Sequence, residues 1–447
     1  YKHEAQERLI VEELATNLIG VKIASEKINK LRAQEMKASE EELKTFKENF
    51  PFNLTNAQSR TIKEISEDIA LKKPMRRLVQ GDVGSGKTVV AAVSMFIAAK
   101  NNTQSVLLCP TEVLAEQHFK NFLEWFKKSN IKIELLTGKL PNAKRKRIYQ
   151  DLENGDIDIL IGTHAVFQDK VVMKNLGLIV VDEQQRFGVK QRFDLVKKST
   201  NRIMPHQLFM TATPIPRTLA MTIFADLETS KIDELPPGRK PVETLVYNEK
   251  KKNEIVKRLE AVCKAGNQVF WLCTMIEESE NLDVQAADEA KEWIKENTHG
   301  LNIGLVHSKL SKDQRDKEIE SFRSGKTNVL VCTTVIEVGM DVPNASLMVI
   351  ENAERLGLSQ LHQLRGRVGR KADLEAYCVL IYHGEIGEIA KARLEAMKST
   401  NDGFEISEID MKLRGSGEIL GTKQSGGIEL KISDLSRDAH LINKAEK

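Results

Sequence analysis

The sequence lacks any apolar run close to the roughly 18 residues that a membrane-spanning helix requires. Its first residues are polar and contain no apolar core of a signal peptide. Neither sign of charge dominates, because lysine and arginine number 67, aspartate and glutamate number 64, and the net charge is +3. This balance does not indicate a polyanionic partner, so any basic surface has to be local. We therefore expect a cytoplasmic globular protein.

Cysteine is scarce and shows no pairing pattern. Four of the five cysteines lie in apolar, strand-like runs, and none belongs to a C-x-x-C motif. This pattern indicates reduced core residues in a reducing compartment, and it does not favour metal ligands or disulfides. The four are Cys109, Cys273, Cys332 and Cys378.

The chain has 447 residues, enough for two or three domains, and its lack of an initiating methionine indicates a segment of a longer protein. Residues 1–49 are predicted to form a helical connector. Ser39 and Glu42 have the spacing of a capping box at the start of its second helix. Three- and four-residue spacings predict one apolar face on the first helix. That face comprises Leu14, Leu18, Val21, Ala24, Ile28 and Leu31.

Beyond residue 50, short apolar runs alternate with amphipathic stretches, which predicts βα units around parallel sheets. A proline-rich segment, residues 233–241, interrupts this alternation and indicates a stiffened linker. We therefore expect an α/β fold with two lobes in tandem, residues 50–232 and 233–385. The expected strands are 78–79, 106–109, 157–161, 178–181 and 208–210, then 269–273, 303–306, 329–332, 347–350 and 377–381.

Residues 386–447 are predicted to form a C-terminal helical hairpin with a loop. Leu394 and Met397 follow helical spacing, residues 401–403 have the composition of a turn, and residues 406–413 form a second short helix. A glycine-rich loop over residues 415–427 follows the hairpin.

The strongest local motif is Gly81-Asp-Val-Gly-Ser-Gly-Lys-Thr88, which matches the phosphate-binding loop G-x-x-x-x-G-K-[ST] at every position. Backbone N–H groups of such a loop, and the helix N-terminus that follows it, surround phosphate oxygens. Lys87 is expected to reach the β- and γ-phosphates of ATP, and the Thr88 hydroxyl to coordinate Mg²⁺. The predicted nucleotide-binding residues of the loop are Gly81, Gly84, Ser85, Gly86, Lys87 and Thr88.

Two further motifs predict the rest of a hydrolytic site. A buried strand ends in Asp182-Glu183, where Asp182 is expected to hold Mg²⁺ through water and Glu183 to position and deprotonate the attacking water. In the second lobe, Arg367 and Arg370 lie among glycines and are expected to stabilise the γ-phosphoryl group in the transition state. Each motif alone fits a plain strand end or a solvated basic loop, but their occurrence together favours ATP hydrolysis.

These motifs, in this order, resemble the superfamily 2 helicases, and most closely the RecG-type branch-migration helicases. The resemblance covers nearly the whole chain from about residue 50, and it implies two RecA-like P-loop lobes. The blocks that carry it are Leu54-Thr-Asn-Ala-Gln-Ser-Arg60, Gly81-Asp-Val-Gly-Ser-Gly-Lys-Thr88, Pro110-Thr-Glu-Val-Leu-Ala-Glu-Gln-His118, Gly162-Thr-His164, Thr211-Ala-Thr-Pro-Ile-Pro-Arg-Thr218, Ile232-Asp-Glu-Leu-Pro-Pro-Gly-Arg-Lys240, Thr333-Thr-Val-Ile-Glu-Val-Gly-Met-Asp-Val-Pro343 and Arg355-Leu-Gly-Leu-Ser-Gln-Leu-His-Gln-Leu-Arg-Gly-Arg-Val-Gly-Arg370.

The resemblance implies a monomeric ATP-dependent DNA helicase that uses ATP and Mg²⁺. It would translocate on duplex DNA and remodel branched DNA, such as stalled forks and Holliday junctions, in recombination and repair. Gln58 would read the adenine edge, and Asp341 would contact the ribose or help to close the site between the lobes. The residues implied in nucleic-acid binding or coupling are Thr111, Thr163, His164, Thr211, Thr213, Thr334, Gln363, Arg414 and Gln424.

The C-terminal hairpin and loop resemble a translocation motif that the family shares with transcription-repair coupling factors. The sequence departs from the family pattern at three positions: Gln185 replaces a usual histidine, Ser416 a proline and Lys423 an arginine. Lysine lacks the planar fork of arginine, so a bidentate contact at that position would be lost. The wedge domain with which the family recognises branched DNA has no counterpart in these residues.

Three alternatives remain at this point. The motor of a transcription-repair coupling factor shares the C-terminal motif, although residues 232–240 favour the RecG type. An RNA helicase has the same two-lobed core, although the C-terminal motif favours duplex DNA. An ATP-gated clamp would not require Lys87, Glu183 and Arg370 together, so an enzyme is the favoured interpretation.

Overall fold

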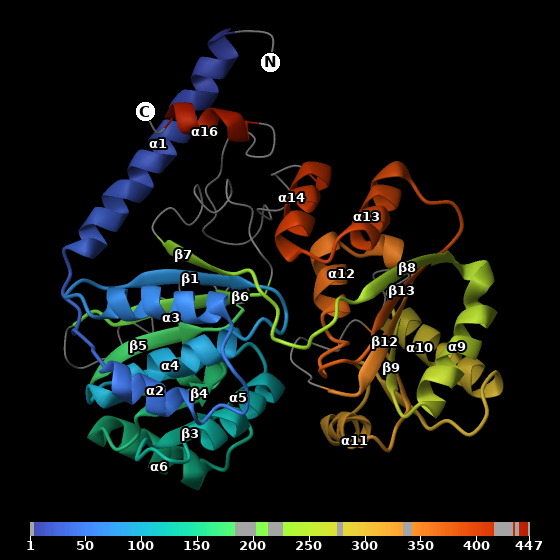
Figure 1. Cartoon of the computed structure of the whole chain (residues 1–447), viewed down its shortest axis with the longest axis horizontal. Coiled ribbons are helices and arrows are strands. Elements are labelled where there is room, and N and C mark those ends of the chain that lie inside the picture. Colours follow the sequence, from blue (N-terminus) through green and yellow to red (C-terminus); the bar gives the residue numbers. More distant parts are fainter. Residues whose placement is uncertain are drawn as a thin grey trace. The chain divides into compact units, whose positions relative to one another are not determined.

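The computed structural model describes residues 4–183, 203–212, 227–274, 280–333, 342–414, 432–433 and 438–445. The chain divides into two compact units, one formed by Tyr1–Leu235 with Arg414–Lys447 and the other by Pro236–Leu413. Each unit contains one parallel β-sheet (Figure 1). The predicted α/β fold with two lobes in tandem is therefore confirmed.

Lobe 1 has a seven-stranded sheet in the order β3-β4-β2-β5-β6-β1-β7, and every strand pair in it is parallel. Apolar clusters cover both faces, since Leu78 belongs to one cluster and Val79 to the other. Burial on both faces explains why its central strands are nearly continuous apolar runs. The strands are β1 (Arg76–Gly81), β2 (Gln104–Leu108), β3 (Ile133–Leu136), β4 (Ile159–Gly162), β5 (Leu176–Val181), β6 (His206–Thr211) and β7 (Glu228–Ile232), and the helices of this unit's N-terminal part are α1 (Glu4–Asn29), α2 (Glu40–Lys47), α3 (Asn56–Ile69), α4 (Lys87–Lys100), α5 (Glu112–Trp125), α6 (Asn142–Asn154) and η1 (His164–Phe167).

Lobe 2 has a six-stranded parallel sheet in the order β10-β11-β9-β12-β13-β8. Its faces are also both covered, because Phe270 and Trp271 of β9 pack into opposite clusters. The strands are β8 (Glu243–Asn248), β9 (Gln268–Cys273), β10 (Ile303–Val306), β11 (Val329–Thr333), β12 (Ala345–Glu351) and β13 (Tyr377–Tyr382), and the helices are η3 (Glu249–Lys251), α9 (Lys252–Lys264), α10 (Glu280–Glu296), α11 (Lys312–Arg323), η4 (Ala353–Arg355), α12 (Leu358–Arg365), α13 (Glu388–Ser399) and α14 (Gly403–Arg414).

Three strands, β3, β7 and β8, are absent from the sequence prediction, and all three lie at sheet edges. In β7 only Ser230 and Ile232 are buried, and in β3 only the two end residues are. An edge strand is covered less completely than a central one, so it accepts polar residues and lacks the apolar run on which the prediction rests.

The predicted capping box starts α2. The Ser39 hydroxyl accepts a hydrogen bond from the Glu42 N–H, and the Glu42 carboxylate accepts one from the Ser39 N–H. The predicted apolar face of the first helix is partly wrong, because α1 ends before Leu31, whose side chain is 48% exposed. Leu14 of the same face is fully buried, as predicted.

The end of the chain packs on its first helix. The C-terminal helix α16 (Ala439–Ala445) lies against α1 within the same unit (Figure 1). Leu441 of α16 is buried there. The Glu13 carboxylate of α1 accepts a hydrogen bond from the Ser433 N–H at 2.7 Å, and Lys444 forms an ion pair with Glu7 at 2.6 Å. This packing attaches the chain end to the N-terminal helix through both apolar and polar contacts.

The helices α13 and α14 form the predicted hairpin and pack on lobe 2, where Met397 and Ile406 join the core. The buried Arg365 guanidinium of α12 donates hydrogen bonds to the carbonyls of Met397 and Thr400, both at 2.8 Å. Ser359, also on α12, donates to the Asp410 carboxylate of α14 at 3.0 Å. The hairpin is therefore bonded to the helix that leads into the arginine loop.

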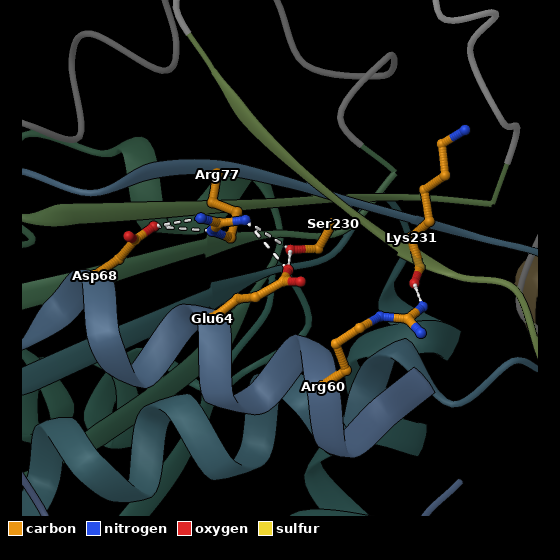
Figure 2. A network of polar contacts seen from close by, with 6 residues as sticks. All are labelled: Arg60, Glu64, Asp68, Arg77, Ser230 and Lys231. Carbon is orange, nitrogen blue, oxygen red and sulfur yellow. Dashed lines mark hydrogen bonds and ion pairs between the residues drawn. The ribbon is translucent and has the colours of Figure 1, made fainter. Parts of the chain in front are cut away.

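A buried polar network attaches α3 to the lobe 1 sheet (Figure 2). Arg77 of β1 donates to Asp68 at 2.8 Å and to the Ser230 hydroxyl of β7 at 2.8 Å. Its guanidinium also lies 3.4 Å from the Glu64 carboxylate. An arginine that is 8% exposed requires such partners, because an unpaired buried charge is strongly destabilising.

The start of α3 is attached to β7 and to the segment that follows it. Arg60 donates to the Lys231 carbonyl at 3.0 Å, as Figure 2 shows, and to the Asp233 carboxylate at 2.8 Å. The Ala57 N–H donates to the Glu234 carboxylate at 3.0 Å. The first part of the predicted linker is therefore bonded to lobe 1.

All five cysteines are buried and form no disulfide in the structure, and their burial confirms the predicted core positions of Cys109, Cys273, Cys332 and Cys378. Burial raises the pKa of the Cys378 and Cys263 thiols to about 12. Within the described ranges, no helix is long and apolar enough to cross a membrane.

His206, at the start of β6, joins lobe 1 to the segment after α1. Its Nδ1 accepts a hydrogen bond from the Met75 N–H at 3.0 Å, and its Nε2 lies 2.9 Å from the Gln34 carbonyl. Nδ1 must therefore be unprotonated, and Nε2 must carry the proton, so only the neutral ring satisfies both contacts. Burial lowers the pKa of His206 below its usual value of 6.5.

We predict that His206 makes the free energy of unfolding fall with acid. A lowered pKa in the folded state means that its contribution is complete above about pH 6.5 and is lost as the pH falls below that value. In a His206→Asn variant, which keeps an acceptor near Nδ1 but cannot titrate, this loss should be absent. Denaturant unfolding should be measured for the parent and His206→Asn between about pH 7.5 and pH 5.5. The difference in their free energies of unfolding should shrink as the pH falls, and a difference that does not change with pH would contradict the prediction.

Candidate nucleotide-binding site

The phosphate-binding loop connects the end of β1 to the start of α4, as its sequence predicts. Gly84 and Gly86 have φ angles of 77° and 85°, in the left-handed region where a side chain costs roughly 1–2 kcal/mol. Gly86 is the N-cap of α4, so the positive end of that helix faces the loop. Free N–H groups at a helix N-terminus are suited to binding phosphate.

Polar side chains within the loop also fit a nucleotide phosphate. The Lys87 ammonium is buried and donates to the carbonyls of Gly81 at 2.6 Å and Asp82 at 2.9 Å. The Ser85 hydroxyl is buried and has no hydrogen-bond partner among the residues that the structure describes. A buried hydroxyl without a partner costs free energy, and an oxygen of a bound phosphate would supply one. Thr88, the predicted Mg²⁺ ligand, is half-buried at the start of α4.

Gln58 lies against this loop and is 3% exposed. Its Nε2 donates to the Ser85 carbonyl at 2.8 Å, and its Oε1 accepts from the Thr55 N–H at 2.9 Å in the capping box of α3. The amide therefore joins α3 to the phosphate loop. Its predicted contact with adenine stays a prediction.

The acidic pair follows β5 at the carboxyl edge of the sheet. Because β6 pairs with both β5 and β1, the acidic pair, the end of β6 and the phosphate loop follow three adjacent strands. Asp182 and Glu183 are 7% and 5% exposed. Asp182 Oδ2 lies 3.0 Å from His118 Nε2, and Glu183 accepts a hydrogen bond from the Ala212 N–H at 3.3 Å. The second contact joins the predicted water-activating carboxylate to the Thr211-Ala-Thr motif.

The predicted nucleic-acid residues of lobe 1 follow other strands at the same edge of the sheet. Thr111 is the N-cap of α5, where its hydroxyl accepts from the Leu114 N–H at 3.3 Å, so it caps a helix in this structure. Thr163 is buried after β4, and His164 beside it is exposed. Thr211 is the last residue of β6 and is buried. A nucleic-acid contact of any of them stays a prediction.

In lobe 2, α12 carries Gln363 and leads into the arginine loop. Arg367 and Arg370 are half-buried, and Arg370 Nε donates to the Gly366 carbonyl at 3.2 Å. Gly369 has a φ angle of 67°. This geometry fixes the loop within lobe 2, and the predicted contact of its arginines with a nucleotide on lobe 1 stays a prediction.

Several predicted residues lie outside the described residues. They are Thr213, Thr334, Asp341, Gln424, the side chain of Arg414, and the three departures Gln185, Ser416 and Lys423.

Sequence reasoning missed two buried side chains in this region. The sequence assigns no role to His118, because its contact with Asp182 spans 64 residues of sequence. The sequence also assigns no role to Arg365, the last residue of α12, although this side chain is 2% exposed and donates a hydrogen bond to the hairpin. A histidine within an otherwise apolar helix face was the available signal for the first, and the sequence offered none for the second.

Three family models match the chain. A DEAD/DEAH box helicase model matches residues 55–222, and a helicase conserved C-terminal domain matches residues 251–372. A third, described as ATP-dependent DNA helicase RecG, domain 3, C-terminal, matches residues 400–447. The fold and these models define a two-lobed superfamily 2 helicase core.

The matches to individual proteins are more specific. The chain is 47% identical over 99% of its length to the ATP-dependent DNA helicase RecG of Haemophilus influenzae and 46% identical over 100% to that of Escherichia coli K12. A solved structure of RecG bound to a three-way DNA junction matches 98% of the chain with a TM-score of 0.78 and 40% identity. The chain belongs to the RecG family. It spans 64% of the length of these two curated relatives and 57% of the chain in that structure.

Other helicases share only the fold. The structure of Mss116p bound to single-stranded RNA matches 81% of this chain and 76% of its own, with a TM-score of 0.60 and 18% identity. Identity at that level does not favour an RNA substrate for this chain.

We predict that Gly86→Ala abolishes most nucleotide binding. The φ angle of 85° strains an alanine, and its Cβ would collide with the Gln58 amide. Gly266→Ala is the matched control, because Gly266 has a φ of 84° but open space around a Cβ. Thermal unfolding should report a destabilisation of roughly 1–2 kcal/mol in Gly266→Ala and at least as much in Gly86→Ala, while titration with a fluorescent nucleotide should report lost binding only for Gly86→Ala. Equal nucleotide affinity in the two variants would contradict the role given to this contact.

Proposed function

We propose that this chain is the ATP-driven motor of a RecG-type helicase, which hydrolyses ATP to move along duplex DNA and remodel branched DNA. The observation that carries the proposal is the 47% identity to a RecG helicase over 99% of the chain. The phosphate loop and the acidic pair, which follow the strands on either side of β6 in one sheet, support it. A RecG protein has been solved with a three-way DNA junction, which supports branched DNA as the substrate class.

In the proposed reaction, lobe 1 binds and orients the nucleotide. Lys87 contacts the β- and γ-phosphates, and the loop N–H groups hold the phosphate oxygens. Thr88 and Asp182 would hold Mg²⁺, which would supply positive charge against the phosphate oxygens when bound. Glu183 positions the attacking water and accepts its proton. Arg367 and Arg370 of lobe 2 stabilise charge on the transferring phosphoryl group.

Coupling of this reaction to movement would use the contacts around the same carboxylates. The hydrogen bond from the Ala212 N–H to Glu183 joins the hydrolytic residue to the Thr211-Ala-Thr motif. In lobe 2, Arg365 bonds the start of the arginine loop to the hairpin. Changes at the nucleotide would thus reach two segments that the resemblance assigns to translocation.

We expect ATP hydrolysis to be stimulated by duplex DNA. Hydrolysis should be measured without nucleic acid and with duplex DNA, single-stranded DNA, branched DNA and RNA, with Lys87→Ala as the blank. Stimulation by RNA alone would overturn the proposal in favour of an RNA helicase. No hydrolysis above the blank under any condition would favour an ATP-gated clamp.

We further expect Glu183→Gln to retain ATP binding and to lose hydrolysis. Removing a general base typically costs about 10²–10⁴-fold in rate, while the phosphate loop is untouched. Single-turnover hydrolysis with duplex DNA and equilibrium nucleotide binding should be compared with the parent. Turnover near the parental rate would show that another group activates the water.

A further inference from the structure

The proposed function gives no role to His118, a buried side chain next to the predicted Mg²⁺ carboxylate. His118 lies on α5 and is 4% exposed. Its Nε2 lies 3.0 Å from Asp182 Oδ2, and its Nδ1 is buried with no hydrogen-bond partner among the described residues. The ring therefore makes one polar contact in the described structure, and that contact is to Asp182.

The hydrogen bonds of Asp182 fix how its carboxylate is oriented. Oδ1 accepts from the Glu183 N–H at 3.1 Å, and Oδ2 is in contact with His118 Nε2. An ionised carboxylate can only accept, so the proton of this contact lies on Nε2. Each oxygen has one donor and retains further lone pairs, because a carboxylate has about four acceptor positions in total.

The carboxylate is held by donors from two elements. Asp182 itself follows β5, and its N–H donates to the Leu108 carbonyl at the end of β2 at 2.9 Å. The donor on Oδ2 comes from α5, the helix that follows β2. Rotation of the carboxylate would therefore break a contact with a separate, packed helix.

We propose that His118 is a positioning residue that orients Asp182 for Mg²⁺-dependent nucleotide binding. The inference rests on the proposed function, since it takes Asp182 as the carboxylate that holds the ion. Groups that hydrogen-bond to a metal ligand fix its orientation, and their loss typically costs about 10–100-fold in metal affinity or activity. His118 touches neither the nucleotide nor the water in this proposal, and it acts only through Asp182.

A purely structural role of the contact between His118 and Asp182 leads to a different expected result. If the contact only stabilises lobe 1, its loss lowers the free energy of unfolding and leaves the effect of Mg²⁺ on nucleotide affinity unchanged. If His118 orients Asp182, its loss lowers the effect of Mg²⁺ and leaves metal-free nucleotide affinity unchanged. The ratio of nucleotide affinities with Mg²⁺ and with EDTA separates the two cases without any measurement of hydrolysis.

The test compares His118→Gln with His118→Met in the 447-residue chain. Glutamine and methionine have similar length and helix propensity, but only glutamine offers an N–H donor at the position of Nε2. Affinity for a fluorescent ADP analogue should be measured across a Mg²⁺ titration and in EDTA, alongside thermal unfolding. Should the methionine variant not fold, His118→Asn replaces it, because its amide ends one bond closer to Cβ and cannot reach Asp182.

We expect His118→Met to need a Mg²⁺ concentration about 10-fold or more above that of the parent to reach half of the Mg²⁺-dependent gain in nucleotide affinity. Its nucleotide affinity in EDTA should stay within twofold of the parent. The glutamine variant should recover most of the gain. Equal behaviour of the two variants, or an equal loss with Mg²⁺ and with EDTA, would overturn the inference. If the parent hydrolyses ATP with DNA and His118→Met has the same Mg²⁺ response as the parent, this inference alone is overturned. If the parent does not bind nucleotide, the proposed function is overturned.

Discussion

All strands of the lobe 1 sheet run in one direction, and the placement of the candidate site depends on this constraint. Parallel strands end at one edge, so the segments that follow β1, β5 and β6 meet there although they are far apart in the sequence. The phosphate loop, the acidic pair and the Thr211-Ala-Thr motif therefore all lie at this edge. If β1 or β5 were antiparallel, its motif would lie at the opposite edge, and the ammonium of Lys87 would be separated from the carboxylates.

The parallel sheet alone does not hold the site, because several side chains must also be fixed in orientation. Gln58 depends on α3, and the Arg77 network bonds α3 to β1 and β7. The orientation of the Asp182 carboxylate depends on α5, through the contact with His118. In both cases a buried polar group attaches a helix to a strand end, and a buried polar group of this kind stabilises only when its partners are present.

The sequence predicts most of the central architecture and the position of the chemical motifs. It does so because central parallel strands are continuous apolar runs and because the phosphate loop has a fixed spacing. It fails at β3, β7 and β8, since these edge strands carry polar residues such as Glu134 and Lys231. The contact between His118 and Asp182 depends on the packing of α5, which no local pattern encodes. Arg365 is missed for a similar reason, because two of its hydrogen bonds go to backbone carbonyls of the hairpin, and every residue type has such a carbonyl.

The burial of every cysteine has a practical consequence for measuring movement of the two lobes with attached dyes. Thiolates, not thiols, react with maleimides, so burial of all five native cysteines, which also raises the pKa of the Cys263 and Cys378 thiols, disfavours their labelling. A cysteine introduced at the exposed Lys146 of α6 and another at the exposed Lys317 of α11 would therefore be labelled selectively. The energy transfer between two dyes at these positions would follow the distance between the lobes through a nucleotide cycle, with no need to remove a single native cysteine from the core.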